Sequence, residues 1–335
     1  MVGMKDVARR ANVSTATVSH VLNGTRYVSR ETAMKVYDAM RELNYRPNSV
    51  ARSLRSKKSR TIGLLVPMTP QGVSNSYFMS VAQGIEKVLK ANGYNLILSN
   101  SNDDALTEME QIRVFDSQLI DGLIIAPSSQ ELPYLREAMT GDYPLVFIDR
   151  KPRAFAGDSI VTDGGGGTYR AVTHLIRSGH RRIGFISASL SLATSEERLQ
   201  GYRRALAEHG IEPDDALVQA AKEHGSSFEH GYRLACRLHR DHRATALFVA
   251  NNVMTMGALK YLQEHRVTVP EEVALVGFDD YEWALITKPP LSMVRQPSQS
   301  VGEVAAQVLL DRIRDPSTSM QEIRLPTEFI LRSSC

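Results

Sequence analysis

From Thr61 onward the chain alternates short apolar runs with amphipathic stretches, and this alternation limits the folds open to it. The apolar runs are TIGLLVP, YNLILSN, DGLIIAP and PLVFID, then RRIGFIS, ATALFVA and EEVALVGF. Between them, apolar residues recur at helical spacing, for example over 77–91 and 106–119 in the first series and over 196–209 and 254–265 in the second. Strands alternating with helices form parallel sheets covered on both faces, so the sequence predicts two doubly wound α/β lobes.

The strand ends of these lobes predict a ligand site. In open parallel sheets a ligand lies at the carboxyl ends of the strands, which here would face a cleft between the lobes. Polar pairs follow three of the predicted strands: Asp149-Arg150, Asn251-Asn252 and Asp279-Asp280. We expect the chain to cross between the lobes near 161–164 and 290–297.

The first sixty residues follow a different pattern, with three short helical segments. The apolar residues at helical spacing are Val7, Ala8 and Ala11, then Val18, Val21 and Leu22, then Ala33, Val36, Met40 and Leu43. The turn Asn12-Val13-Ser14 is short enough for a helix-turn-helix unit. Ser14 and Ser29 are placed to cap the helices that follow them. Such a unit places its second helix in the major groove of double-stranded DNA.

Charge is distributed unevenly along the chain. Residues 1–60 contain thirteen Lys and Arg against four Asp and Glu, a net charge of +9, while the remaining residues have a net charge of −6. The whole-chain value of +3 therefore combines a strongly basic N-terminal segment with a mildly acidic body. This asymmetry indicates a nucleic-acid contact confined to one end of the chain.

The runs KDVARRANVSTATVSHVLN and VSRETAMKVYDAMRELNYRPN resemble the headpiece of the LacI/GalR family of bacterial repressors. The headpiece is most similar to that of purine-responsive members, and the resemblance extends through nearly the whole chain. It implies a headpiece at 1–47, a hinge at 48–60, and an effector-binding and dimerisation core of periplasmic-binding-protein-like fold at 61–335. It also implies a homodimeric repressor of carbohydrate catabolism genes under small-molecule control.

In that family the second helix reads base edges, which assigns Thr15, Ala16, Thr17 and His20 to DNA contact. Hydroxyl side chains can contact phosphate or base, a methyl group suits thymine, and an imidazole can donate or accept at a purine edge. Arg26 follows the helix, where its guanidinium could reach base edges or phosphate. With two headpieces on a dimer, the expected partner is a pseudo-palindromic operator.

The family's hinge becomes helical on DNA, and paired leucines wedge into the minor groove. Leu54 occupies the wedge position, with Ala51 and Arg55 beside it. An apolar wedge is favoured at an easily unstacked pyrimidine–purine step, such as a central CG. On its own, the segment 48–56 is a poor helix, which suits folding coupled to binding.

The resemblance also assigns effector contacts in the cleft. These are Tyr77, Phe78, Arg150, Arg198, Asn251 and Asp279, and the run DDYEWA, similar to members that respond to sugar acids, adds Trp283 as a stacking face. Paired hydroxyls of a carbohydrate need planar donors and acceptors of this kind.

Departures from the family pattern bear on the ligand. Asn252 replaces a frequent aspartate, Leu192 aligns with an arginine that purine-binding members use, and Ser226 lies near an aromatic position. These changes argue against a purine. Because Asn252 removes one acidic side chain from the family pattern while Arg150 and Arg198 remain, the sequence predicts a relatively cationic pocket. A cationic pocket favours an anionic effector, so we expect a sugar acid such as a gluconate derivative.

The remaining signals indicate no cofactor, metal or catalytic chemistry. The glycine run 164–167 lacks the residues of a P-loop and the spacing of a dinucleotide fingerprint, so we expect a flexible strand-to-helix turn there. His239 and His242 have no carboxylate or cysteine at metal-ligand spacing around them. No nucleophile–base pair with recognisable spacing marks an enzyme.

Two cysteines in 335 residues suit a reducing cytosol. No stretch reaches the roughly eighteen apolar residues that a membrane span needs. These observations predict a cytoplasmic regulator located at the nucleoid. A soluble sugar-binding receptor without a regulatory role is the alternative, and the basic headpiece argues against it. A nucleotide- or sugar-processing α/β enzyme is a third hypothesis.

Overall fold

Three short helices form the N-terminal unit. Helix α1 spans Met4–Ala11, α2 spans Thr15–Asn23 and α3 spans Arg30–Glu42. The backbone N–H of Thr17 donates to Ser14 Oγ at 3.0 Å, and that of Thr32 donates to Ser29 Oγ at 3.3 Å. Both predicted N-caps are therefore confirmed, and each satisfies a backbone donor that the helix itself leaves unpaired.

The core of the headpiece is small and uses the predicted apolar positions except Ala33, with Ala39 as an addition. Its buried residues are Val7, Ala8, Ala11, Val18, Val36 and Ala39, and half-buried Val21, Leu22, Met40 and Leu43 pack against them. Asn12 ends α1 with φ 52°, a left-handed conformation that asparagine tolerates and that lets the chain turn sharply into α2.

The computed structural model describes residues 2–24, 26–45, 59–68, 75–129, 135–152, 157–221 and 227–335. It divides into two units, Met1–Ser59 and Arg60–Cys335. The expected hinge residues Ala51, Leu54 and Arg55 lie outside the described residues.

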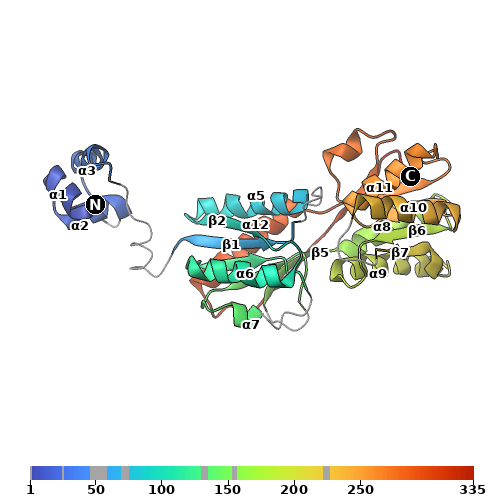
Figure 1. Cartoon of the computed structure of the whole chain (residues 1–335), viewed down its shortest axis with the longest axis horizontal. Helices are drawn as coiled ribbons and strands as arrows, with labels where there is room; N and C mark the ends of the chain where they lie inside the picture. Colours follow the sequence, from blue (N-terminus) through green and yellow to red (C-terminus); the bar gives the residue numbers. More distant parts are fainter. Residues whose placement is uncertain are drawn as a thin grey trace. The chain divides into compact units, whose positions relative to one another are not determined.

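Two six-stranded sheets organise the second unit, one in each lobe (Figure 1). The sheet of lobe 1 has the order β11-β5-β4-β3-β1-β2, with strands at Glu322–Leu325, Asp158–Thr162, Leu145–Ile148, Gly122–Ile125, Thr61–Val66 and Asn95–Asn100. The sheet of lobe 2 has the order β12-β10-β9-β8-β6-β7, with strands at Glu328–Ile330, Ser292–Arg295, Ala274–Phe278, Ala246–Val249, Ile183–Ser187 and Val218–Ala220. Among these pairs only β10 with β12 is antiparallel. The predicted α/β class with two doubly wound lobes is confirmed.

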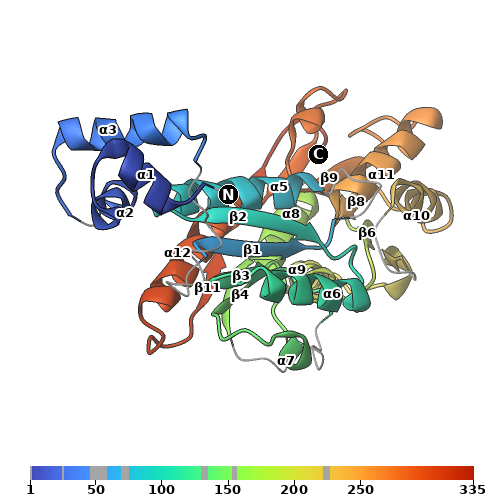
Figure 2. The ribbon, with the colours of Figure 1, turned by 60° about the vertical axis from the view of Figure 1, so that its left-hand side comes forward.

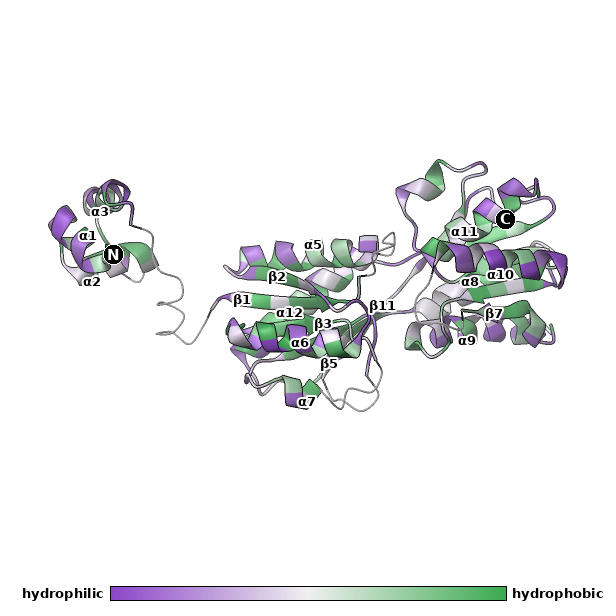
Figure 3. Cartoon of the chain, in the orientation of Figure 1, coloured by the Kyte–Doolittle hydropathy of each residue, from purple (hydrophilic) through white to green (hydrophobic). Residues whose placement is uncertain are grey.

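Helices cover both faces of each sheet (Figures 1 and 2). In lobe 1 they are α5 (Asn75–Ala91) and α12 (Ser298–Arg314) on one face and α6 (Ala105–Ser117) and α7 (Leu135–Ala138) on the other. In lobe 2 they are α8 (Gly164–Arg177) and α9 (Ala193–Glu208), opposite α10 (Phe228–Arg240) and α11 (Asn252–Glu264). Figure 3 shows strands β1 and β3 as largely hydrophobic, whereas α10 presents many hydrophilic residues. Within the described ranges, no helix is long and apolar enough to cross a membrane.

Several strands lack a signal in the sequence because they are short and partly polar. Strands β7 (Val218–Ala220), β11 (Glu322–Leu325) and β12 (Glu328–Ile330) have three or four residues each and lie at sheet edges. The equally short β3, β4 and β8 were predicted because they are apolar throughout, whereas β7, β11 and β12 each contain polar residues.

The glycine run at 164–167 is the first turn of α8, so the prediction of a flexible turn there is wrong. Asp163 caps this helix, because its Oδ1 accepts the backbone N–H of Gly166 at 2.8 Å. Helix α9 also packs too closely for side chains here: a Cβ on Gly201 would lie 2.1 Å from the Gly165 carbonyl oxygen. The glycines therefore serve helix packing.

Helices α10 and α11 also meet through glycines. A Cβ on Gly257 of α11 would lie 2.0 Å from the Phe228 carbonyl oxygen, and one on Gly231 of α10 would lie 2.1 Å from that of Met254. Real side chains do not approach backbone so closely, so this helix pair depends on both glycines.

The chain passes between the two lobes at three places. The first crossing joins β5 to α8, the second joins β10 to α12, and the third joins β11 to β12. The sequence suggested crossings near 161–164 and 290–297 but not the third, since both of its flanking strands are short. These three segments lie beside the cleft and connect its two walls.

Candidate functional site

Helix α2 presents short polar side chains on its surface. Thr15 and Ala16 are exposed, while Thr17 and His20 are half-buried. The Thr17 hydroxyl lies 2.9 Å from Ser14 Oγ, so this side chain is also part of the N-cap. Arg26 is exposed just beyond the helix. The structure therefore places the four α2 residues on one short helix, with a guanidinium close behind in the chain.

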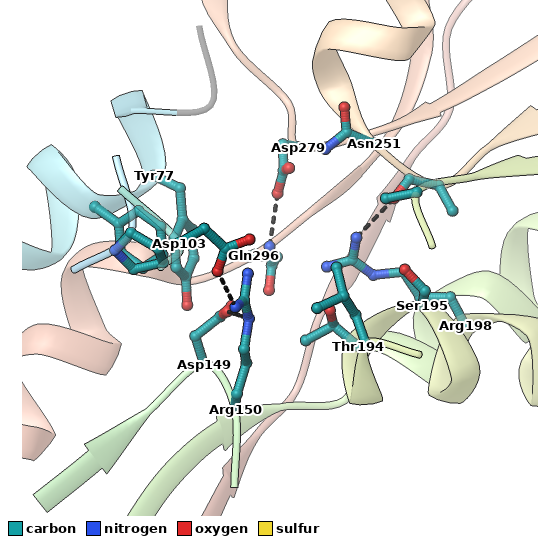
Figure 4. Close-up of a pocket in the computed structure, with 15 residues that line it drawn as sticks. Tyr77, Asp103, Asp149, Arg150, Thr194, Ser195, Arg198, Asn251, Asp279 and Gln296 are labelled. Atoms are coloured by element: carbon teal, nitrogen blue, oxygen red, sulfur yellow. Dashed lines mark hydrogen bonds and ion pairs between the residues drawn. The ribbon is translucent and has the colours of Figure 1, made fainter. Parts of the chain in front are cut away.

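A pocket in the second unit lies where the strands of both lobes end (Figure 4). Its lining residues that follow strands are Pro67 after β1, Asp149 and Arg150 after β4, Ala188 after β6, Ala250 and Asn251 after β8, Asp279 after β9 and Gln296 after β10. The other lining residues are Tyr77, Phe78, Asp103, Leu192, Thr194, Ser195 and Arg198. This is the position that the topology of open α/β sheets favours for a ligand.

The pocket brings together six of the seven expected effector contacts. Tyr77 and Phe78 come from α5, Arg198 comes from α9, and Arg150, Asn251 and Asp279 follow strands β4, β8 and β9. The seventh, Trp283, does not line this pocket. It lies in the 3-10 helix Glu282–Leu285, half-buried against the lobe 2 core. Asp280, which precedes this helix, forms ion pairs with Arg332 at 2.7 Å and with Arg295 at 2.5 Å. These ion pairs hold the loop that places Trp283 outside the pocket.

Arg150 is paired with carboxylates on the lobe 1 side of the pocket. Its Nη1 donates to Asp103 Oδ1 at 2.6 Å and to the Pro127 carbonyl oxygen at 3.2 Å. Its Nε lies 3.4 Å from Asp149 Oδ2. Burial acts to lower the pKa of Arg150, but Asp103 and Asp149 outweigh it, so the pKa is raised. The charge of this guanidinium is therefore largely neutralised within the protein.

Arg198 faces the pocket from lobe 2. Its Nη1 donates to the Ala250 carbonyl oxygen at 2.6 Å, and its guanidinium carbon lies 3.7 Å from the centroid of the Phe278 ring. Its Nε is buried and has no hydrogen-bond partner among the described residues. Stacking on an aromatic face holds the guanidinium rigid while leaving an edge able to bind a ligand.

Burial shifts the titration of three groups in the pocket. It raises the pKa of Asp149 against the opposing effect of Arg150 and Arg198, and it raises the pKa of Asp279 against Arg198 and a hydrogen bond from Gln296. Burial, helped by Asp149 and Asp279, raises the pKa of Tyr77 well above its ordinary value, so the phenol stays protonated. The Tyr77 hydroxyl is a buried donor without a partner among the described residues.

The prediction of a relatively cationic pocket is wrong. Three carboxylates, from Asp103, Asp149 and Asp279, line it against two guanidinium groups, and one of those guanidinium groups is paired. Asn252, whose missing charge supported the prediction, is buried and does not line the pocket. The sequence could not show this, because pairing and side-chain direction depend on the tertiary structure.

Four polar lining residues were not expected: Asp103, Thr194, Ser195 and Gln296. Gln296 follows β10 and Asp103 lies shortly after β2, so the rule that selected Asp149 and Asp279 applies to both. Thr194 and Ser195 stand four and three residues before Arg198, a spacing that places side chains on one helix face.

Sequence comparison places the chain among known proteins. A model of bacterial regulatory proteins of the lacI family matches residues 3–48, and a periplasmic binding protein-like domain matches residues 172–335. The chain is 36% identical over 339 residues to the HTH-type transcriptional repressor PurR of Vibrio atlanticus, covering 100% of this chain and 98% of that protein. It is 35% identical over 335 residues to the ribose operon repressor of Haemophilus influenzae, with coverage of 100% and 98%.

Solved structures show the same relationship. The lac repressor dimer bound to operator and the anti-inducer ONPF superposes with a TM-score of 0.86 at 27% identity, covering 99% of this chain and 98% of that one. The complex of the transcriptional regulator CelR with cellobiose superposes with a TM-score of 0.75 at 29% identity, covering 100% of both chains. The chain therefore belongs to the LacI family of bacterial regulatory proteins. It is a DNA-binding transcriptional repressor built from a helix-turn-helix headpiece and a periplasmic-binding-protein-like body.

Proposed function

We propose that this repressor acts as a homodimer that releases or grips its operator according to a carbohydrate bound between the lobes. The observation that supports it most is the pocket at the strand ends, where Tyr77 Oη and Arg198 Nε are buried polar atoms without partners among the described residues. Buried polar groups are nearly always hydrogen-bonded in proteins, so a polar ligand would satisfy these two. The matched lacI-family headpiece argues against the alternative of a soluble sugar-binding receptor without a regulatory role.

On the DNA side, helix α2 would lie in the major groove. Exposed Thr15 and Ala16 stand at its N-terminus, where recognition helices contact base edges, and His20 follows on the same helix. Arg26 would reach base edges or phosphate beyond the helix. The segment containing Ala51, Leu54 and Arg55 would place the Leu54 wedge at a central CG step between the half-sites of a pseudo-palindrome.

Replacing His20 with alanine should change base preference at one position in each half-site. An imidazole that bonds a base edge contributes about 1–3 kcal/mol of discrimination there and little elsewhere. Binding of a library of operators randomised at single positions measures this. Arg41, an exposed arginine of α3 paired with Asp38, offers a charge-removing control, Arg41→Ala. Uniform weakening at every position would instead show that His20 contacts phosphate.

On the effector side, the pocket offers acceptors and donors suited to a polyhydroxylated ligand. Asp149 and Asp279 would accept from hydroxyl groups, Tyr77 and Asn251 would donate, and Arg198 would bind an oxygen in its plane. The sugar acid is the second candidate, and the unpaired guanidinium of Arg198 is the observation that favours it.

Paired titrations distinguish the two ligand classes. The probes are D-ribose, D-glucose and cellobiose, each with its aldonate, titrated calorimetrically into the full-length protein. Because three carboxylates line the pocket against two guanidinium groups, we expect a neutral sugar to bind more tightly than its aldonate. Tighter binding of an aldonate would assign a sugar acid to the site. Binding of no sugar and no aldonate would overturn the carbohydrate proposal.

A further inference from the structure

A chain of two hydrogen bonds joins the pocket to the opposite lobe. Thr162 Oγ1 donates to Gln296 Oε1 at 2.5 Å, and Gln296 Nε2 donates to Asp279 Oδ1 at 2.6 Å, the latter drawn in Figure 4. Thr162 is the last residue of β5 in lobe 1, whereas Gln296 and Asp279 follow strands β10 and β9 of lobe 2. One end of this hydrogen-bonded series is thus a pocket carboxylate of lobe 2, and the other end belongs to the sheet of lobe 1.

The Gln296 amide is used at both of its ends. Its oxygen accepts from one lobe while its nitrogen donates to a carboxylate of the other, and the side chain is 9% exposed. Bonds in such buried chains polarise one another, so a change at one end alters the other. A ligand hydroxyl that donates to Asp279 competes for the lone pairs that Gln296 Nε2 now uses. Ligand binding therefore changes the bond between Gln296 and Thr162.

Within the described part of the chain, other hydrogen bonds and ion pairs between the lobes do not connect a residue of the pocket to the opposite lobe. Arg324 of β11 pairs with Glu197 of α9 at 2.5 Å, but their side chains are 44% and 34% exposed, and such pairs contribute little. The first and third crossings are joined by Asp163 N donating to Leu325 O and by Thr327 Oγ1 donating to Asp163 O, both at 2.8 Å. None of these five residues lines the pocket at the strand ends.

We propose that Gln296 is a positioning residue that transmits ligand occupancy of the pocket to the angle between the lobes, acting through Asp279 on one side and Thr162 on the other. The proposal rests on the proposed function, since it requires a ligand whose binding changes operator affinity. The proposed role separates two quantities that a substitution in the pocket usually reduces together: the affinity for the ligand and the effect of the ligand on operator affinity. Ligand affinity depends on the pocket, whereas the ligand's effect on operator affinity depends also on Thr162.

The variant Thr162→Val of the full-length protein isolates the second quantity. Valine keeps the shape of threonine and removes the hydroxyl, and Thr162 is not among the described residues that line the pocket. The probe is whichever sugar or aldonate of the panel above binds wild type most tightly. We expect the affinity of the variant for the probe to differ from that of wild type by less than about twofold. The second quantity is the ratio of the operator affinity without probe to the operator affinity with saturating probe, and we expect this ratio to move at least about fivefold closer to one. Operator binding and calorimetry on the same preparation measure both.

Two further variants make the result specific. Thr168→Val removes a buried hydroxyl that donates to the Gly164 carbonyl oxygen at 2.9 Å outside the chain, and we expect it to leave the ratio unchanged. Gln296→Glu replaces the donor facing Asp279 with an acceptor and should also bring the ratio closer to one. Because Thr162 acts through Gln296, adding Thr162→Val to Gln296→Glu should bring the ratio no closer to one.

The possible failures differ from one another. A Thr162→Val protein that responds to the probe as wild type does, or additive effects in the double variant, would overturn the role of Gln296 and leave the proposed function intact. A wild-type protein that binds no compound of the panel would overturn the carbohydrate proposal and, with it, the inference drawn from it.

Discussion

Replacing Arg198 with alanine is expected to lower effector affinity by at least about 100-fold, because a charged hydrogen bond and a rigid stacked guanidinium are lost together. Arg198 is the guanidinium in the pocket that no carboxylate within ion-pair distance neutralises in the described part of the chain. Its removal also takes away the cation that lowers the pKa of Asp279 and one of the two cations that lower the pKa of Asp149, the other being Arg150. Calorimetry with the best-binding probe measures the loss, and operator affinity without probe should stay as in wild type.

Arg204 provides a matched control on the same helix. It stacks on Tyr169, with its guanidinium carbon 4.2 Å from the ring centroid, but it is exposed and does not line the pocket. Arg204→Ala therefore removes the same charge and the same kind of stacking, and effector affinity should not change. If Arg198→Ala bound the probe as tightly as Arg204→Ala, the effector would lie elsewhere.

Replacing Gly257 with alanine should destabilise lobe 2 by about 2 kcal/mol or more, because the added methyl group would meet backbone that cannot move independently. The new Cβ would lie 2.0 Å from the Phe228 carbonyl oxygen and 2.8 Å from the Tyr232 nitrogen. Helix propensity alone predicts the opposite sign, a gain of about 1 kcal/mol for alanine over glycine. The sign of the change therefore decides between the two effects.

The single tryptophan of the chain reports on this part of the structure. Trp283 packs against the core cluster to which α10 and α11 contribute, so its fluorescence follows unfolding of lobe 2 in denaturant. Gln263→Ala, at an exposed position of α11, should leave the free energy of unfolding nearly unchanged. A more stable Gly257→Ala protein would show that α10 and α11 are not held in close contact.

The sequence predicted the elements that have a long or regular pattern. The apolar runs of β1, β3, β4, β6, β8 and β9 and the capped helices of the headpiece follow from periodicity and from Ser14 and Ser29. Strands β7, β11 and β12 did not, because they are short, lie at sheet edges and contain polar residues, so no continuous apolar run marks them. The third crossing between the lobes escaped prediction for the same reason.

The pocket shows a similar division between position and environment. The rule that ligands lie at strand ends identified Arg150, Asn251 and Asp279 as neighbours although they are far apart in sequence. It could not show that Asp103 pairs with Arg150, because the order of the strands does not determine the directions of the side chains at their ends. Nor could it show the direction of Trp283, which the loop anchored at Asp280 determines. The location of a site follows from topology, whereas its charge depends on side-chain pairing.

The most direct test of the account is selection of genomic DNA fragments by the full-length protein, with and without the panel of neutral sugars and aldonates. We predict enrichment of a pseudo-palindromic site with a central CG step, whose occupancy at least one carbohydrate changes. Salt-sensitive binding without a preferred sequence, unaffected by every compound of the panel, would contradict the account.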